Sequence, residues 1–335
     1  MTIRDAFRNQ ASHCAALGSP FMERLMTLAA EHLKPGAPVT DRIFFWDGDA
    51  SANADNVPLR LAGALHALKL QGKALSSVYP PNTPDDNTLW QAVEDAMTAH
   101  SGHILDWLER PPQTNEVRRA AVILPALALL HDAFGLPVEL LELGTSGGLN
   151  LRCDMFRLDL PNAFLGPADG AVVLSPDWSG LLPPHKLPII VRRAGVDLSP
   201  LDPEKPDERL RLLAYLWADQ PERLALTSAA IDLARTNPAE ISAGDAGEWL
   251  ERQLSVPTEE RLRVVLHTVS WQYFPLKTRT QAENAMRCAA GPIARIAMEY
   301  DGGKGAGVTL TTWPDGAQRE IARADFHGRW VEWKV

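Results

Sequence analysis

The amino-acid sequence predicts an α/β fold, in which a mostly parallel sheet with an antiparallel C-terminal edge follows an N-terminal helical domain. Two observations support this class. From residue 138 onward, short apolar segments typical of strands alternate with amphipathic segments typical of helices, as in parallel β-α-β units. Before residue 135, apolar residues recur mainly at helical spacing. We therefore expect a helical cap domain over residues 1–135 and a Rossmann-like domain over residues 136–335.

The helical part is expected to contain a helix that starts at Ser19 and Pro20, a residue pair typical of a cap and a first turn. Apolar spacing predicts further helices over residues 59–70, about 89–110 and 113–135. Pro125 lies inside the last of these and should kink it. Residues 41–50 are expected to form a short strand or an irregular segment.

In the second part, strands are expected where apolar and β-branched residues cluster between turn residues. These segments are residues 138–143, 187–198, 263–271, 293–300, 307–313 and 327–335. The helices between them are expected over residues 207–219, 221–236 and 279–290. A bend at residues 314–316, Pro-Asp-Gly, separates the last two strands, so we expect them to form an antiparallel edge.

The most informative segment is VELLELGTSGGLN, from Val138 to Asn150. A buried-strand pattern with one carboxylate, Glu142, leads into a glycine-rich turn and then a helix start. Glycines let the backbone bend sharply and approach a ligand, while the N–H groups of the helix start point into the crevice at the strand ends. The segment therefore predicts a ligand site. Its expected cofactor contacts are Glu142, Gly144, Ser146, Gly147, Gly148 and Asn150.

This turn has two functional interpretations. A further interpretation is a structural turn that binds no ligand. One functional interpretation is the cofactor loop of a Rossmann-like methyltransferase, in which an acidic residue precedes a glycine-rich turn. The other is the nucleophile elbow of an α/β-hydrolase, because the turn also matches G-x-S-x-G with Ser146 as the nucleophile. Asp245 with His267 or His327 would then complete a triad in chain order. The helical character of residues 1–135 and the lack of an HGGG-type segment favour the methyltransferase interpretation.

Polar residues that follow the later strands agree with a cofactor lying across the strand ends. Asp197 ends the second expected strand and could accept hydrogen bonds from ribose hydroxyls. Asp245 stands where the third strand should end, near an adenine amine, and His267 ends the fourth. Glu142 and Asp197 are separated by more than the roughly 20 residues usual for such a pair. We attribute the excess to an inserted hairpin over residues 157–186, and the role of Asp197 depends on that segment lying outside the main sheet.

The composition excludes several classes of partner. A formal net charge of -9 disfavours bulk attraction to nucleic acid or to an anionic membrane. The first ten residues lack the apolar core of a signal peptide, and the longest apolar run, Ala120 to Leu130, is too short to span a bilayer. We therefore expect a cytoplasmic protein with a small-molecule substrate. The scattered cysteines and the His100–His103 pair predict no metal site, and the oligomeric state is left open.

The chain resembles the bacterial family catalogued as domain of unknown function 2332. The resemblance runs from GSPFMERL to HGRW and includes QTNEVRRA, ELGTSGGLNL, RAGVDLSPLD, AYLWADQPER, SAGDA and HTVSWQYFP. Gly147 stands where the family motif E-L-G-x-S-A-G-L-N-L has alanine. The resemblance implies a methyltransferase-like fold and a crevice between helical domain and sheet. The matched positions implied to line it are Gln113, Asn115, Glu116, Arg119, Asp154, Arg193 and His267.

Together these features predict an S-adenosylmethionine-dependent methyltransferase that acts on a small molecule. His267 or Glu116 is the expected general base, and Tyr273 joins Gln113, Asn115, Arg119, Asp154 and Arg193 as expected substrate contacts. In-line methyl transfer needs mainly positioning of the reactants, so a base is required only for some acceptors. The alternatives are a hydrolase that uses Ser146 and a catalytically silent protein that binds a nucleotide metabolite.

Overall fold

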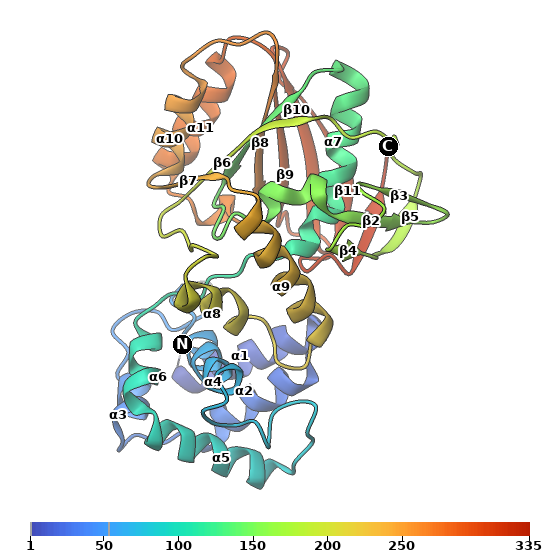
Figure 1. Cartoon of the computed structure of the whole chain (residues 1–335). Helices are drawn as coiled ribbons and strands as arrows, with labels where there is room; N and C mark the ends of the chain where they lie inside the picture. The colour runs from blue at the N-terminus through green and yellow to red at the C-terminus, as the bar shows by residue number, and fades with distance from the viewer. Residues whose placement is uncertain (1, 53) are drawn as a thin grey trace. The chain divides into compact units, whose positions relative to one another are not determined.

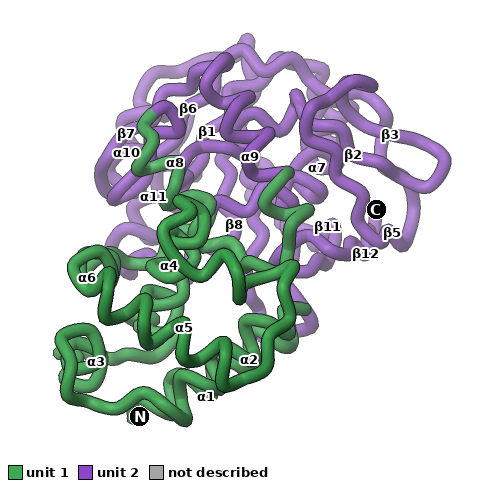
Figure 2. The backbone as a smooth tube through the Cα atoms, turned by 60° about the horizontal axis from the view of Figure 1, so that its bottom comes forward, with its two compact units in different colours: residues 1–114, 205–225 green, residues 115–204, 226–335 purple. Residues whose placement is uncertain are grey.

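The computed structural model describes residues 2–52 and 54–335 and divides the chain into two compact units (Figures 1 and 2). Unit 1 comprises residues 1–114 and 205–225, and unit 2 comprises residues 115–204 and 226–335. The sequence placed the boundary at residue 135, whereas the units divide at residue 115 and residues 205–225 return to unit 1. The helix α7 (Ala120–Phe134) belongs to unit 2, because it is apolar on nearly all sides and packs against the sheet unit.

Unit 1 is helical. Its helices are α1 (Ile3–Ala16), α2 (Pro20–His32), α3 (Pro38–Phe44), α4 (Val57–Leu70), α5 (Asp86–Ala99), α6 (Ser101–Leu108) and α8 (Pro206–Ala214). Ser19 caps α2 as expected, since its side chain accepts the N–H of Met22. The strand considered for residues 41–50 is not formed. Pro38 at the first turn and Thr40, whose hydroxyl bonds to the Ala37 backbone, start a helix there instead.

Unit 2 is built on a nine-stranded sheet with the order β5-β12-β11-β10-β9-β8-β1-β6-β7. The strands are β1 (Val138–Leu143), β5 (Asp177–Gly180), β6 (Ile190–Asp197), β7 (Glu240–Ala243), β8 (Leu262–Thr268), β9 (Ile293–Glu299), β10 (Ala306–Trp313), β11 (Ala317–Ala324) and β12 (Trp330–Trp333). Strands β7, β6, β1, β8 and β9 are parallel, whereas β9 to β12 run antiparallel to one another. The mostly parallel sheet with an antiparallel C-terminal part is thus confirmed.

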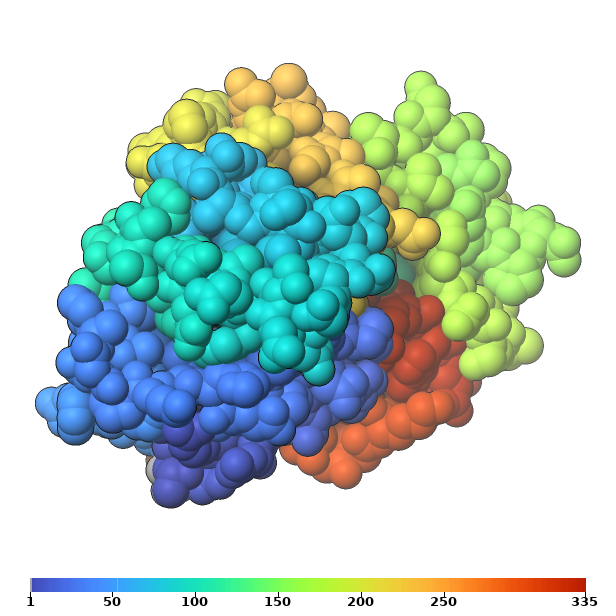
Figure 3. All heavy atoms as spheres, turned by 90° about the horizontal axis from the view of Figure 1, so that it is seen from below, coloured from blue at the N-terminus to red at the C-terminus, as the bar shows by residue number. Residues whose placement is uncertain are grey.

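The segment over residues 157–186 divides between two sheets. The strands β2 (Arg157–Leu160), β3 (Ala163–Leu165) and β4 (Val173–Leu174) form a separate three-stranded sheet. The strand β5 instead pairs with β12 at the edge of the main sheet, and Trp178 stacks on Trp333 there. In Figure 3 the yellow-green residues of this segment lie beside the red C-terminal segment. The expectation that the whole segment lies outside the main sheet is therefore wrong for β5, although β1 and β6 remain adjacent.

Helices cover both faces of the main sheet (Figure 1). The odd-numbered residues Leu141, Leu143 and Val265 pack with α10 (Ala246–Leu254) and α11 (Leu276–Cys288). Because side chains alternate along a strand, Glu142 faces the opposite side of the sheet, whereas His267 faces the same side as Val265. The remaining elements are α9 (Pro221–Thr236), which runs from unit 1 into unit 2, and the 3-10 helices η1 (Val117–Arg119), η2 (Leu149–Met155) and η3 (Trp271–Tyr273).

Candidate functional site

The strand order reverses beside β1, where the carboxyl ends of the parallel strands share one edge. From β1 the chain continues to β6 and β7 on one side, and then crosses to β8 and β9 on the other side. Ligands of open α/β sheets bind beside such a reversal, at the loops that leave the neighbouring strands. The edge between β1 and β8 is therefore the candidate site.

The glycine-rich turn after β1 folds back over β6. The N–H groups of Gly144 and Thr145 both donate to the carbonyl oxygen of Val196, at 2.9 and 3.1 Å. Gly144 has a φ of +72°, and a Cβ atom there would lie 2.6 Å from the Cβ atom of Ser270 in the turn after β8. Glycine is therefore required for the two turns to approach each other.

The next residues of the turn are bound by side chains from neighbouring elements. Ser146, at a φ of +52°, donates its N–H to Asp197 Oδ2 at 2.9 Å. The other carboxylate oxygen of Asp197 accepts the N–H of Ser199 at 2.9 Å. Gly147 is buried between Ser146 and Gly148. The turn and the end of β6 are thus tied together through Asp197, the acid predicted to lie there.

The helix that follows the turn is a 3-10 helix, η2. Gly148 precedes it with a φ of +68°, and Arg152 inside it departs from helical angles with a φ of -105°. The Arg152 guanidinium is buried and bonds to the carbonyl oxygens of Gly148 and Asn237 at 2.6 and 2.8 Å. A helix thus starts after Gly148, as the sequence predicted, and it is of the 3-10 type.

Glu142 lies in the layer beneath the turn. Its Oε2 atom accepts the hydroxyl of Thr145 at 2.5 Å, and Gly195 of β6 leaves room for the Thr145 side chain. Burial raises the pKa of the Glu142 carboxyl to about 8, whereas the Thr145 hydrogen bond and the charge of Arg152 lower it by less. Burial also lowers the pKa of Arg152 to about 10. Glu142 is thus a buried acid that supports the turn from below.

His267 is held by a carboxylate that the sequence patterns did not single out. Its Nδ1 atom lies 2.7 Å from Oε1 of Glu299, the last residue of β9. The same oxygen accepts the N–H groups of Ser270 and Trp271, both at 3.1 Å, and the Trp271 ring stacks on the imidazole at 4.7 Å. Glu299 is distant from His267 in the sequence, so no motif joins the two residues. The one signal for Glu299 in the sequence is its position as a polar residue at the end of an apolar strand.

Asp245 serves the fold in a way that the sequence interpretation did not foresee. Its Oδ1 atom accepts the N–H groups of Gly247 and Glu248 at the start of α10, and its Oδ2 atom accepts the hydroxyl of Thr278 in α11. It therefore caps one helix and joins it to the next. Since His267 pairs with Glu299, the Asp245–His267 contact of the hydrolase interpretation is not present.

The segment at residues 115–119 connects the turn with the end of β8. Asn115 Oδ1 accepts the N–H of Leu149, and Asn150 donates to the carbonyl oxygen of Glu116. Arg119 donates to the carbonyl oxygen of Thr268 at 2.8 Å. The structure thus brings these predicted residues together at the strand ends.

The remaining predicted substrate contacts are dispersed. Arg193 in β6 pairs with Asp154 at the end of η2, and Glu116 caps η1 by accepting the N–H of Arg118. Tyr273 in η3 is 65% exposed. Gln113 belongs to unit 1.

Several buried polar atoms at this edge have no hydrogen-bond partner within the described residues. They are Ser146 Oγ, Asn150 Oδ1, His267 Nε2 and Glu299 Oε2. An unsatisfied buried polar atom costs about 1–3 kcal/mol, so such atoms are usually retained where a ligand or water completes them. Their concentration at the ends of β1, β8 and β9 supports a binding site there.

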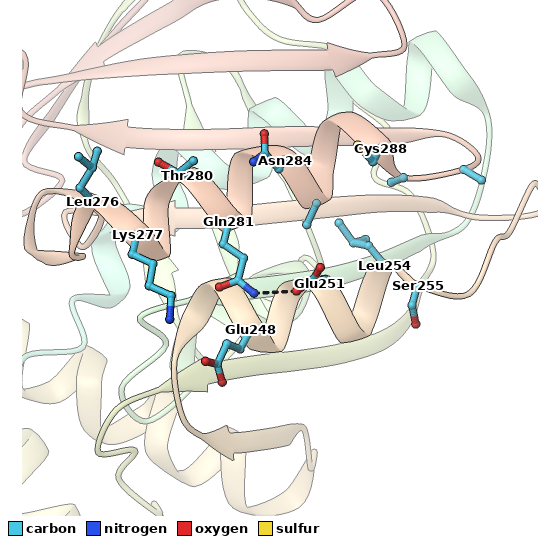
Figure 4. A pocket seen from close by; sticks show the side chains of 13 residues that line it. Glu248, Glu251, Leu254, Ser255, Leu276, Lys277, Thr280, Gln281, Asn284 and Cys288 are labelled. Atoms are coloured by element: carbon cyan, nitrogen blue, oxygen red, sulfur yellow. Dashed lines mark hydrogen bonds between the residues drawn. The ribbon is translucent and has the colours of Figure 1, made fainter.

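A separate groove runs along the outside of unit 2 between α10 and α11 and has a volume of about 950 Å³ (Figure 4). Polar side chains such as Lys277 and the hydrogen-bonded pair Gln281–Glu251 border it, and Leu254 and Ala285 contribute to its apolar part. None of the predicted site residues lines this groove. It is therefore distinct from the edge between β1 and β8.

Within residues 2–52 and 54–335, no cluster of three or more histidine, cysteine or acidic side chains could hold a metal ion. Over the same residues, no helix has the length and apolar character needed to cross a membrane.

No curated protein and no solved structure matches the chain. A family match covers residues 4–333, nearly the whole sequence. The chain thus belongs to the family described as uncharacterized proteins conserved in bacteria, DUF2332.

Proposed function

We propose that this protein binds S-adenosylmethionine at the carboxyl ends of β8, β1 and β6 and is a methyltransferase for a small-molecule acceptor. The observation that carries the proposal is the strand-order reversal beside β1. It gathers a strand-end acid, Glu142, a glycine turn and a second acid, Asp197, at one edge of a parallel sheet. S-adenosylmethionine supplies an electrophilic methyl group on a positively charged sulfur.

The hydrogen bonding of the turn favours this ligand over a nucleotide phosphate. Phosphate loops offer several backbone N–H groups to an anion. Here the N–H groups of Gly144, Thr145, Ser146 and Gly148 donate to protein oxygens. A ligand that carries a sulfonium, an ammonium group and ribose hydroxyls needs acceptors instead, and carboxylates and carbonyl oxygens supply them.

The turn suits a hydrolase less well. Ser146 has the left-handed backbone of a nucleophile elbow, a turn that presents the serine hydroxyl to the substrate. Yet its hydroxyl makes no hydrogen bond with His267, and Asp245 is engaged in capping α10. A nucleophilic serine depends on a histidine base within hydrogen-bond reach, so methyl transfer is the better supported proposal.

Calorimetric titration with S-adenosylmethionine and with its demethylated product tests the proposal. We expect binding of at least one of them. A ligand at ~100 times its dissociation constant should add about 2.7 kcal/mol of stability, visible as a rise of a few degrees in the melting temperature. Absence of both heat and thermal shift at millimolar concentrations of either molecule would overturn the proposal.

The Asp197→Asn variant then tests the predicted ribose contact. Loss of a charge-assisted acceptor should weaken binding by about 1.5–3 kcal/mol, or about ten- to a hundredfold. Because Asp197 also accepts the N–H of Ser146 and Ser199, the melting temperature must be recorded beside the affinity. The control variant is Glu332→Gln, which also removes one negative charge but at an exposed position on β12, away from this edge.

A further inference from the structure

We propose that Glu299 is a positioning residue that keeps the His267 proton on Nδ1, so that Nε2 accepts the proton of a methyl acceptor bearing an O–H or N–H group. The inference rests on the proposed methyl transfer and specifies its substrate class. It concerns the buried group formed by His267, Glu299 and the turn after β8.

The three contacts of Glu299 Oε1 fix the direction of its hydrogen bond to His267. The backbone N–H groups of Ser270 and Trp271 can only donate, so Oε1 acts as an acceptor. Burial opposes ionisation of this carboxyl, but the hydrogen bond from His267, the charge of that ring when protonated, and the N–H groups of Trp271 and Ser270 together hold the pKa of Glu299 below its ordinary value. An ionised acceptor at 2.7 Å requires that Nδ1 carry the hydrogen.

The opposite ring nitrogen is then available as an acceptor. Once Nδ1 holds the proton of a neutral imidazole, Nε2 presents its lone pair. Within the described residues no protein group reaches this buried atom. Stacking against Trp271, with the two planes 21° apart, restricts the orientation of the ring. A fixed histidine with one nitrogen held by a carboxylate is the arrangement of a general base.

The position of this group relates it to the candidate site. Ser270, whose N–H is bound by Glu299, also donates its hydroxyl to the carbonyl oxygen of Leu143 at the end of β1. The same serine lies against Gly144. Glu299 therefore fixes both the histidine and the turn that borders the glycine turn.

The substrate class follows from the proton balance. A neutral acceptor with an O–H or N–H group must release that proton when its oxygen or nitrogen forms the bond to the methyl carbon. The acceptor's lone pair would form the new bond to the methyl carbon, the electrons of the broken carbon–sulfur bond would stay on sulfur, and the acceptor proton would pass to Nε2. An acceptor without such a proton would have no use for a base here.

The tautomer of His267 can be measured by NMR of the full-length protein labelled with ¹⁵N-histidine. The His267→Gln variant identifies the resonances. We expect the proton on Nδ1 in the wild type and in Glu299→Gln, because the glutamine oxygen can still accept it. In Glu299→Ala we expect a shift toward the Nε2-protonated form, which free histidine prefers. A purely structural role of Glu299 would not produce this pattern.

Small probes test the substrate class in the same spectra. Phenol as an O–H donor or aniline as an N–H donor should shift the Nε2 resonance, whereas methoxybenzene, matched in shape but without a donor, should not. A wild-type ring protonated on Nε2, or on both nitrogens, would overturn the tautomer assignment, even where Glu299→Ala does not fold. No shift with either donor would overturn the substrate class. Calorimetry with the demethylated cofactor is run in parallel, so failure of cofactor binding is recognised separately from failure of the tautomer.

Discussion

Glu142 carries a proton at neutral pH, because burial raises the pKa of its carboxyl to about 8. The unfolded chain, with an ordinary pKa near 4.5, releases that proton. Between these values the folded state binds a proton that the unfolded state does not, so stability falls as the pH rises through this window. Each unit of pKa difference corresponds to about 1.4 kcal/mol.

Glu142→Gln should remove this pH dependence while keeping an oxygen for the Thr145 hydroxyl. We expect the variant to gain stability relative to the wild type as the pH is raised from 5 to 8. Urea denaturation at several pH values measures the difference, and the exposed Glu332→Gln serves as the control. Parallel stability curves of variant and wild type over this range would show that Glu142 is ionised in the folded protein.

At the scale of elements, the glycine turn and the turn after β8 form one packed unit. The hydroxyl of Ser270 joins the second turn to the end of β1, and the missing side chain of Gly144 allows the close approach. We therefore expect a substitution in either turn to change the packing of the other. Backbone strain and steric contact contribute to that effect separately.

Gly144→Ala should destabilise the protein by about 1–3 kcal/mol, from strain at positive φ and contact with Ser270. Gly135→Ala is the matched control, since Gly135 has a φ of +65° and a Cβ atom there would meet no other atom within 4 Å. The loss of stability in Gly144→Ala beyond that in Gly135→Ala measures the steric contact with Ser270. Adding Ser270→Gly to Gly144→Ala should recover part of this additional loss. Equal losses in Gly144→Ala and Gly135→Ala would contradict a packed pair of turns.

For the whole molecule, the main sheet depends on strands that are far apart in the sequence. β5, which lies between β1 and β6 in the chain, pairs with β12 at the edge of the sheet. Gly180 allows this pairing, because a Cβ atom there would lie 1.9 Å from the carbonyl oxygen of Trp333. A side chain at residue 180 would therefore disturb this edge pair.

Gly180→Ala should open this edge locally and leave the centre of the sheet folded. Hydrogen exchange followed by mass spectrometry should show lost amide protection in β5 and β12 but retained protection in β1 and β8. Gly302→Ala, at a φ of +88° in open space, controls for backbone strain alone. Unchanged protection in both edge strands would contradict the expected effect.

The sequence predicted the parts of the fold that have strong local patterns. The buried run of β1, its glycine turn and the acid at the end of β6 were all recognisable. β11 was not anticipated, because its first half is exposed and mostly polar. Glu299 was missed since its partner comes from the neighbouring strand, a tertiary relation that spacing along the chain cannot show. The predicted domain boundary differs from the structural one because α7 belongs to the sheet unit that follows it, and because residues 205–225 leave their sequence neighbours for unit 1.

The pairing of β5 with β12 has a consequence for the order in which this protein forms on the ribosome. β5 emerges early, whereas β12 follows every other strand of the sheet. Through most of translation β5, with Trp178, therefore lacks its permanent neighbour, and unpaired strands of nascent chains invite pairing with other chains. β5 is only four residues long, and a short strand exposes few backbone N–H and C=O groups to other chains. Its length therefore limits such intermolecular pairing.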